Sequence, residues 1–201
     1  MIMDKKRVKL IKVFLEKNSQ INLSAIRDDE WVYIKHILDA LEVQKVFELK
    51  EWMEVCDVGT WGGFPLLPLA IEYPDVKFTG IDSVRKKIDA IWDMTKQLWI
   101  PNIELLWKRA EEFKDKQFDV LTARAVAYVD KLLPRTKHLL KQWGVWILFK
   151  QVDELERQDL LQLCASMNLK LEKRHTYKLF EWDIERVIYV VRRLGGIWKV
   201  R

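Results

Sequence analysis

The sequence predicts an α/β fold with a mixed, mostly parallel seven-stranded sheet and N-terminal helices. Short apolar runs alternate with amphipathic segments of helical period from residue 54 onward, which is typical of βα units. The last two apolar runs follow each other with no helical segment between them, so they should pair antiparallel. The 201 residues are 49% hydrophobic and 32% charged, which suits a sizeable core. We therefore predict a single domain over residues 1–201.

The first 45 residues are predicted to form a helical extension that precedes the α/β core of residues 46–201. Residues 4–17 carry apolar side chains at helical spacing, and Asn18, Ser19 and Gln20 interrupt the pattern. A second helix is predicted over about 28–42, with Asp28 as its N-cap. Its apolar positions should face inward.

The core is predicted to contain seven strands and four helices. The final pair of strands has no helix between its members. The strands are expected within 54–59, 77–83, 103–113, 118–126, 144–150, 169–179 and 185–193. The helices are expected over 65–73, 84–98, 131–140 and 153–168. Pro65 suits the first turn of the first of these helices. A sheet of this kind has helices on both faces.

Composition restricts the class of protein. The net charge of +5 favours a polyanionic partner without proving one. No apolar run reaches the length of a membrane span, and the N-terminus lacks the pattern of a signal peptide. Cys56 and Cys164 lack metal-ligand spacing, so we expect reduced thiols, no bound metal and a cytoplasmic protein.

The end of the first predicted strand carries the clearest site motif, Asp57-Val58-Gly59-Thr60-Trp61-Gly62-Gly63-Phe64. Ligands of doubly wound sheets bind at the carboxyl ends of strands, where glycines let the backbone approach closely. Asp82 ends the second strand and can accept hydrogen bonds from ribose hydroxyls. The spacing does not suit a dinucleotide. It matches the acidic residue and G-x-G-x-G of an S-adenosylmethionine site, except that Trp61 replaces a glycine.

At this point the chain resembles the ribosomal RNA small subunit methyltransferase G family, also called the glucose-inhibited division protein B family. The resemblance rests on DVGTWGGFPLLPLAI, TGIDSVRKKIDAI, INLSAIRDDEWVYIKHILDAL, KRAEEF, FDVLTARAVA and LLKQWGVWILFK, in the family's order. It covers roughly residues 15–150. It implies a Rossmann-like class I methyltransferase that moves a methyl group from S-adenosyl-L-methionine to N7 of a guanine in 16S rRNA. The implied partner is the small ribosomal subunit or its assembly intermediate, and we expect a monomer.

The resemblance also assigns binding residues one at a time. The motif with Gly59, Gly63 and Phe64 would line the methionine and ribose portion of the cofactor. Asp82 would meet the ribose, and Ala110 with Glu111 would lie beside the adenine. Arg124 would stand at the mouth of the site. His36 and Asp39 match a family motif to which we assign no role.

Each of these residues also has a purely structural interpretation, which stays open. Phe64 could belong to the core, and Glu111 could begin a solvated helix. Arg124 in an apolar strand needs a partner, which a structural ion pair would provide. His36 could be a satisfied helix histidine. The cluster Arg85-Lys86-Lys87 is either a solvated face or a contact for phosphates.

Guanine N7 is a free lone pair, so methylation there removes no proton and needs no general base. Catalysis would come chiefly from alignment of N7, methyl and sulfur, with Arg124 orienting the guanine or its phosphate. The fourth strand end lacks the Asn-Pro-Pro-Tyr type motif of amino-group methyltransferases, which agrees with an N7 target. Three alternatives remain: a class I methyltransferase with another substrate, a catalytically inactive RNA-binding relative, and, more distantly, a nicotinamide enzyme.

Tryptophan usage is unusual. The chain has 10 Trp and 7 Gly, whereas average usage gives about 14 Gly. In the resembling family, glycine is common at the positions of Trp61, Trp99, Trp107 and Trp143, and also at Leu66. Trp61 could be genuine and harmless, or genuine and obstructive. Alternatively these tryptophans are misassigned glycines, because UGA encodes tryptophan in some genetic codes and glycine in others. The short tail RRLGGIWKVR also differs from the family's longer basic ending.

Overall fold

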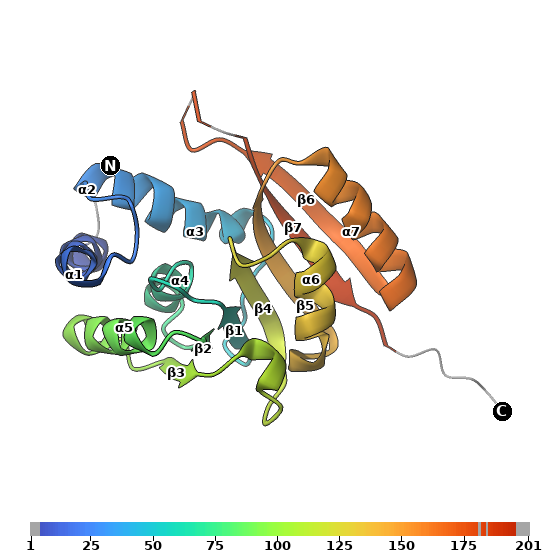
Figure 1. The fold of residues 1–201 in the computed structure, drawn as a ribbon, viewed down its shortest axis with the longest axis horizontal. Helices are drawn as coiled ribbons and strands as arrows, with labels where there is room; N and C mark the ends of the chain where they lie inside the picture. Colours follow the sequence, from blue (N-terminus) through green and yellow to red (C-terminus); the bar gives the residue numbers. More distant parts are fainter. Residues whose placement is uncertain (1–4, 181, 184, 196–201) are drawn as a thin grey trace.

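A computed structural model describes residues 5–180, 182–183 and 185–195; the last six residues of the tail lie outside this range. Its seven-stranded sheet has the order β3-β2-β1-β4-β5-β7-β6 (Figure 1). The first five strands are parallel, and β7 is antiparallel to both neighbours. The strands are β1 Glu54–Val58, β2 Lys77–Asp82, β3 Ile103–Trp107, β4 Phe118–Arg124, β5 Leu140–Gln151, β6 Leu169–Tyr177 and β7 Arg186–Arg193. The predicted mixed sheet and the antiparallel pairing of its last two strands are confirmed.

Helices cover both faces of the sheet (Figure 1). On one face, α1 (Lys5–Ile21), α4 (Leu66–Glu72) and α5 (Arg85–Leu98) pack with Val55, Phe78 and Val120 of the strands. On the other face, α6 (Val129–Thr136) and α7 (Glu154–Met167) pack with Cys56 and Leu121. Neighbouring strand residues therefore serve opposite cores, as the two-residue period of a strand requires.

The predicted second helix forms, but it is divided into several short elements. Asp28 caps α2 (Asp29–Val32), accepting from the backbone N–H groups of Glu30 and Trp31. A π-helical segment (Tyr33–Leu38) follows, then α3 (Asp39–Leu41) and a 3-10 turn (Glu42–Lys45). The wider π-helical turn accommodates one more residue per hydrogen-bonded ring than an α-helix, and such turns are often found at functional sites. It carries His36.

Strand β5 begins at Leu140, four residues before the predicted start. The added segment contains Trp143 in a left-handed backbone conformation (φ 65°), and the pairing with β4 shifts register between Phe118 and Val120. A helical pattern through residues 137–140 hid this irregular start in the sequence. Of the residues in that pattern, Lys137–Leu139 form a 3-10 turn.

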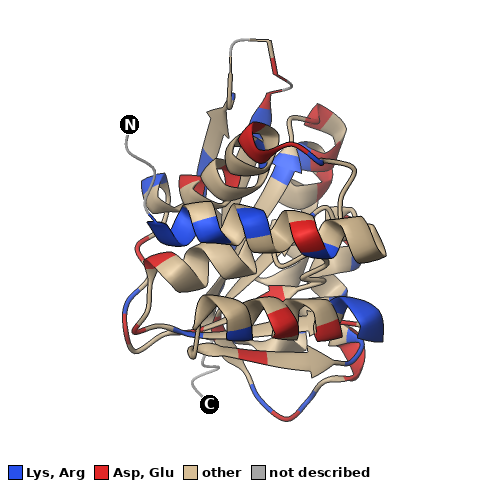
Figure 2. Ribbon diagram, turned by 90° about the vertical axis from the view of Figure 1, so that its left-hand side faces the viewer, with Lys and Arg blue, Asp and Glu red and all other residues tan. Residues whose placement is uncertain are grey.

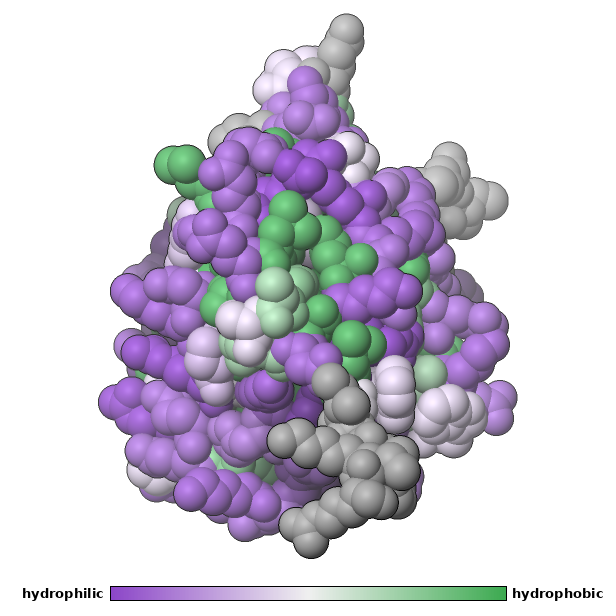
Figure 3. Space-filling view, turned by 90° about the vertical axis from the view of Figure 1, so that its right-hand side faces the viewer, coloured by the Kyte–Doolittle hydropathy of each residue, from purple (hydrophilic) through white to green (hydrophobic). Residues whose placement is uncertain are grey.

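Charge and hydropathy are unevenly distributed over the surface. Figure 2 shows Lys and Arg gathered along the first helix, where Lys5, Lys6, Lys9 and Lys12 are exposed. On the opposite side, Figure 3 shows apolar side chains among hydrophilic ones, and the exposed leucines of α7 are Leu155 and Leu161. Within the described residues, none of the helices is long and apolar enough to cross a bilayer.

Candidate functional site

The turn after β1 is fixed to the end of β2 by its backbone. The N–H groups of Gly59 and Thr60 both donate to the Ile81 carbonyl, at 2.8 and 3.1 Å. Gly59 has φ 66°, and a Cβ there would stand 2.9 Å from a methyl group of Val126. Any larger residue at position 59 would therefore distort the turn. Gly63 (φ 87°) packs against Leu67, and it does not line either of the two cavities that are described below.

Asp82 stands at the carboxyl end of β2 with its carboxylate already oriented. Its two oxygens accept from the backbone N–H groups of Trp61 (3.0 Å) and Val84 (2.8 Å). The side chain is buried but lines a cavity of about 320 Å³, here called the Asp82 cavity. Each carboxylate oxygen keeps a second lone pair for a ligand. The cavity thus offers an anionic acceptor at a strand end.

The Asp82 cavity brings together four residues that the sequence indicated as binding residues. Gly59 and Asp82 come from the ends of β1 and β2. Ala110 and Glu111 come from a 3-10 turn after β3 (Ala110–Glu112). Four basic side chains also line it: Lys87, Lys108, Arg109 and Arg135. The cavity therefore combines acceptors for hydroxyl groups with a basic rim.

A second cavity of about 460 Å³, here called the His36 cavity, adjoins the first. Its lining includes two further predicted residues, Phe64 and Arg124, together with His36. Phe64 is buried and its ring stacks on the His36 imidazole at 4.6 Å between centroids. Phe14 meets both rings edge-on. The cavity thus has aromatic walls and a guanidinium, which suits a flat polar ring.

Trp61 and Ala125 line both cavities, so the indole stands between them. The indole N–H donates to the Leu23 carbonyl, and Lys87 Nζ lies 3.0 Å from the ring centroid. Desolvation lowers the pKa of Lys87. The side chain of Trp61 is 54% exposed, so little core packing depends on it.

Trp61, Trp99 and Trp143 share a left-handed backbone, with φ of 49°, 53° and 65°. This region favours glycine, and a bulky residue there is unusual. Trp107, in contrast, ends β3 without a positive φ, and its indole N–H donates to the Ser83 carbonyl. All four are more than half exposed, whereas Trp146 is fully buried in the core.

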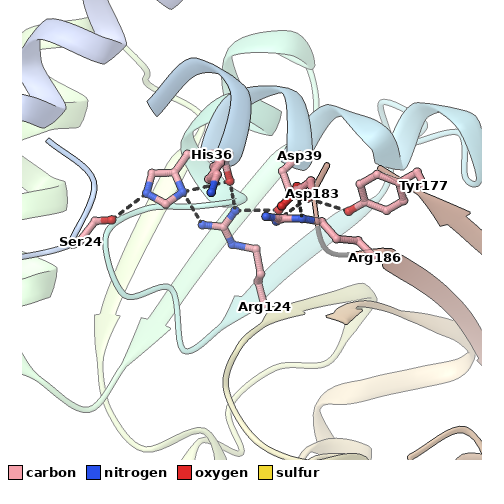
Figure 4. Close-up of polar contacts among 8 residues, drawn as sticks. Ser24, His36, Asp39, Arg124, Tyr177, Asp183 and Arg186 are labelled. Atoms are coloured by element: carbon pink, nitrogen blue, oxygen red, sulfur yellow. Dashed lines mark hydrogen bonds and ion pairs between the residues drawn. The ribbon is translucent and has the colours of Figure 1, made fainter. Parts of the chain in front are cut away.

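Arg124 belongs to a buried polar network on the side of the cavities that faces the π-helical turn (Figure 4). Its Nη1 donates to Asp39 Oδ2 at 2.8 Å and to the Lys35 carbonyl at 3.1 Å, and its Nη2 lies 2.9 Å from His36 Nδ1. Asp39 is 1% exposed, and its other oxygen accepts from the Tyr177 hydroxyl (2.7 Å) and pairs with Arg186 (3.1 Å). The guanidinium of Arg124 thus combines a structural ion pair with a place in the cavity wall.

The electrostatics of the network follow from burial. Desolvation, followed by the charge of Arg124, lowers the pKa of His36 to about 3, so the imidazole is neutral at physiological pH. Burial likewise raises the pKa of Asp57, at the end of β1, to about 6, although the Thr122 hydroxyl donates to it at 2.7 Å. Burial, followed by the adjacent Asp39 charge, raises the pKa of Tyr177.

Sequence reasoning missed Ser24, Tyr177 and Arg186. Ser24 lies in a loop with no chemical signature, although it falls inside the resembling stretch INLSAIRD. Tyr177 and Arg186 reach Asp39 from strands far along the chain. Of the basic cluster, Arg85 and Lys86 are exposed at the start of α5, and only Lys87 lines a cavity. Among the residues described, no group of three or more His, Cys, Asp or Glu side chains could hold a metal ion.

Comparison with known proteins gives one consistent family. The family model described as rRNA small subunit methyltransferase G matches residues 3–181. The protein named ribosomal RNA small subunit methyltransferase G from Lysinibacillus sphaericus is 32% identical, with 94% of this chain and 82% of that protein covered. The protein of the same name from Thermoanaerobacter sp. is 35% identical, with 92% and 79% covered.

Solved structures agree on the fold. A crystal structure of a SAM-dependent methyltransferase from Aquifex aeolicus superposes with a TM-score of 0.64 at 17% identity, covering 90% of this chain and 98% of that one. The ribosomal protein L11 methylase from Lactobacillus delbrueckii gives 0.61 at 16% identity, covering 84% and 80%. At these identities the likeness extends to the class I methyltransferase fold.

Proposed function

This chain belongs to the ribosomal RNA small subunit methyltransferase G family, and we propose that it transfers a methyl group from S-adenosylmethionine to N7 of a guanine in 16S rRNA. One observation beyond family membership carries the proposal. Two adjoining cavities open at the carboxyl ends of the parallel strands, one with strand-end acceptors and one with aromatic and cationic walls. A transfer between two bound partners needs this arrangement.

The residues of the Asp82 cavity fit the nucleoside part of S-adenosylmethionine. The Asp82 carboxylate keeps lone pairs for ribose hydroxyls after its two backbone contacts. Gly59 lines this cavity, and its positive φ and close packing against Val126 both require glycine at this point of the turn. Ala110 and Glu111 would lie beside the adenine, Phe64 would border the methionine arm, and Arg124 would stand at the mouth of the site. Gly63 would help to shape the turn through its positive φ, without lining the cavity.

When bound, S-adenosylmethionine supplies an electrophilic methyl group on a sulfonium. The chain itself then has to hold the acceptor base so that its N7 lone pair points at that group. N7 carries no proton, so no residue needs to act as a base. His36 is neutral, and Arg124 is held by Asp39, so both can orient a base without taking up or releasing a proton.

The proposal includes a partner and a place of action. The exposed lysines of α1, together with Arg27 at the rim of the His36 cavity, suit the phosphates of a folded RNA. The substrate would be the small ribosomal subunit or its assembly intermediate, met in the cytoplasm by a monomer. The chain would act as a single domain, with residues 1–45 as an extension that contributes to the acceptor cavity.

The test is methylation of 30S particles and of protein-free 16S rRNA with labelled S-adenosylmethionine, followed by mapping of the modified base. The expected result is one N7-methylguanine in one of the two substrates. Label at another base or atom would support a class I methyltransferase with a different substrate. RNA binding without any methyl transfer would support the inactive relative, for which the position of Trp61 between the cavities is the argument.

A further inference from the structure

The loop between α1 and α2 carries Ser24 into the wall of the His36 cavity. The buried side chain of Asn18 fixes this loop through three backbone contacts. Its amide donates to the carbonyls of Ser24 (3.0 Å) and Ile26 (2.8 Å), and its oxygen accepts from the Ser24 N–H (2.7 Å). The Ser24 backbone is therefore held independently of the Ser24 side chain.

The imidazole of His36 has a defined tautomer. Arg124 Nη2 lies 2.9 Å from His36 Nδ1, and a guanidinium can only donate, so Nδ1 must present its lone pair. The Lys35 carbonyl, also near Nδ1, receives its hydrogen bond from Arg124 Nη1 instead. Because the ring is neutral, its single proton is on Nε2. Nε2 lies 3.0 Å from Ser24 Oγ and donates to it.

Counting hydrogen bonds then fixes the role of the Ser24 hydroxyl. Its oxygen accepts from His36 Nε2–H and from the Ile26 backbone N–H at 3.1 Å, which uses both lone pairs. The hydroxyl proton has no bonded acceptor within the part of the chain that the structure describes. Ser24 therefore presents a donor to the cavity and has no lone pair left to accept from a ligand.

We propose that Ser24 is a specificity residue that donates a hydrogen bond to O6 of the target guanine, with His36 as the positioning residue that makes it an obligatory donor. The inference rests on the proposed guanine-N7 activity. In guanine, O6 is an acceptor beside N7 on the same edge, whereas adenine has an amino donor there. Two facing donors repel, so the same hydroxyl that binds guanine rejects adenine.

The lining of the His36 cavity supports a base as the occupant. Phe14, Phe64 and His36 give it aromatic surfaces, and its volume of about 460 Å³ lies in the range of ligand pockets. Arg27 is exposed and also lines the cavity, where it suits the phosphate of the same nucleotide. The Asp82 cavity holds the acceptors that suit a ribose, and the aromatic rings and the Ser24 donor of the His36 cavity suit the acceptor base.

The test pairs a protein change with an atom change in the RNA. The substrate is 16S rRNA, or 30S particles rebuilt from it, with guanine or 2-aminopurine at the mapped target position; 2-aminopurine keeps N7 but lacks O6. We expect wild-type kcat/KM to fall by about tenfold or more when O6 is removed. In Ser24→Ala the same replacement should change kcat/KM by less than about threefold, because the partner of O6 is already absent.

Three further variants make the result specific. Ser24→Thr keeps the hydroxyl and should restore the preference for O6. Ser19→Ala, at an exposed hydroxyl near the end of α1, is the matched control and should behave as wild type. His36→Phe keeps a ring against Phe64 but frees a lone pair on Ser24 Oγ. It should therefore reduce the preference for guanine over adenine at the target position.

Each outcome has one meaning. An equal effect of O6 removal in wild type and Ser24→Ala overturns the role of Ser24. Weaker S-adenosylmethionine binding in Ser24→Ala by calorimetry, with an unchanged effect of O6, assigns the hydroxyl to the cofactor and also overturns the inference. If the wild-type protein methylates no guanine N7 in rRNA, the proposed function itself is wrong, and the inference is wrong with it.

Discussion

Trp61 stands between the Asp82 cavity and the His36 cavity, where two bound partners would have to meet. We expect Trp61→Gly to bind S-adenosylmethionine more tightly, because glycine adopts the backbone φ of 49° without strain and removes the indole that separates the cavities. Isothermal titration calorimetry measures the change. The matched control is Trp99→Gly, which has a similar backbone and lines neither cavity. Equal affinity of Trp61→Gly and wild type would contradict an obstructive indole.

The left-handed backbones of three tryptophans lead to a prediction about their codons in the gene. Glycine suits such positions, and the exposed indoles at 61, 99 and 143 contribute little to the core. We expect UGA codons at these three positions, in a genetic code that assigns UGA to glycine. Trp107 has no positive φ, so the structure does not extend this argument to it. UGG at 61, 99 and 143 would refute the prediction.

Arg124 combines a structural ion pair with a place in the wall of the His36 cavity, and kinetics can separate these roles. We expect Arg124→Ala to lower kcat for methylation by about 100-fold, because a small misplacement of the acceptor is costly, while the Kd for S-adenosylmethionine changes far less. Arg124→Lys keeps the charge beside Asp39 and is the matched control for the ion pair. Lower stability with unchanged kcat would leave Arg124 a purely structural role.

Helix α5 offers a comparison of two tryptophans in one element. Trp99 caps its C-terminus with φ 53° and ψ 57°, and its side chain is 86% exposed. Trp92 lies in the helix interior. We expect Trp99→Gly to raise the free energy of unfolding by about 1 kcal/mol, because left-handed C-caps favour glycine. Trp92→Gly should lower it by a similar amount, because glycine is a poor helix former.

Urea unfolding at constant pH measures both variants of α5. The opposite signs are the informative part, since both substitutions remove the same side chain. A loss of stability in both would mean that the exposed Trp99 side chain contributes more than its backbone costs.

The molecule contains two buried groups, Asp57 and His36, whose protonation changes the free energy of unfolding in opposite directions at acid pH. Asp57 has its pKa raised from 3.8 to about 6, so the folded state holds its proton more tightly and the free energy of unfolding falls as pH rises through this window. His36 has its pKa lowered from 6.5 to about 3. Its contribution is present above about pH 6.5 and is lost as pH falls toward 3.

These contributions largely cancel between about pH 4 and 6 in the wild type. We therefore expect Asp57→Asn to lose stability more steeply than wild type on acidification from pH 6 to 4, because the contribution of His36 is no longer offset. Urea unfolding at pH 4, 5 and 6 measures this, with Asp75→Asn at an exposed turn as the control. Parallel stability profiles for Asp57→Asn and wild type would contradict the assignment.

Local patterns in the sequence were sufficient for most of the fold. Alternating apolar runs predicted all seven strands, and the missing helix before Arg186 predicted the antiparallel pair. Asp57, Gly59 and Asp82 revealed the binding turn because each lies at or next to the end of a strand that its own local pattern predicts. The division of the second helix and the early start of β5 at Leu140 escaped prediction, since both depend on backbone irregularities that side-chain periodicity does not encode.

The polar network could not be predicted for a different reason. Asp39 meets Tyr177 and Arg186 across well over a hundred residues of chain, and no local pattern encodes such a contact. The role of Ser24 depends on a tautomer of His36 that Arg124 sets from a third element. Family resemblance marked His36 and Asp39 as motif residues, but only the geometry suggests what they do.

Strand β7 fills the place between β5 and β6, and its Arg186 pairs with Asp39 near the start of the chain. A ribosome synthesises the chain from its N-terminus, so β5 and β6 emerge before β7, the strand that joins them. Asp39 is synthesised earlier still, long before its partner Arg186. The sheet is therefore complete only once β7 has been translated. A nascent chain stalled before residue 186 would lack the strand that joins β6 to the rest of the sheet, and Asp39 would lack its partner Arg186.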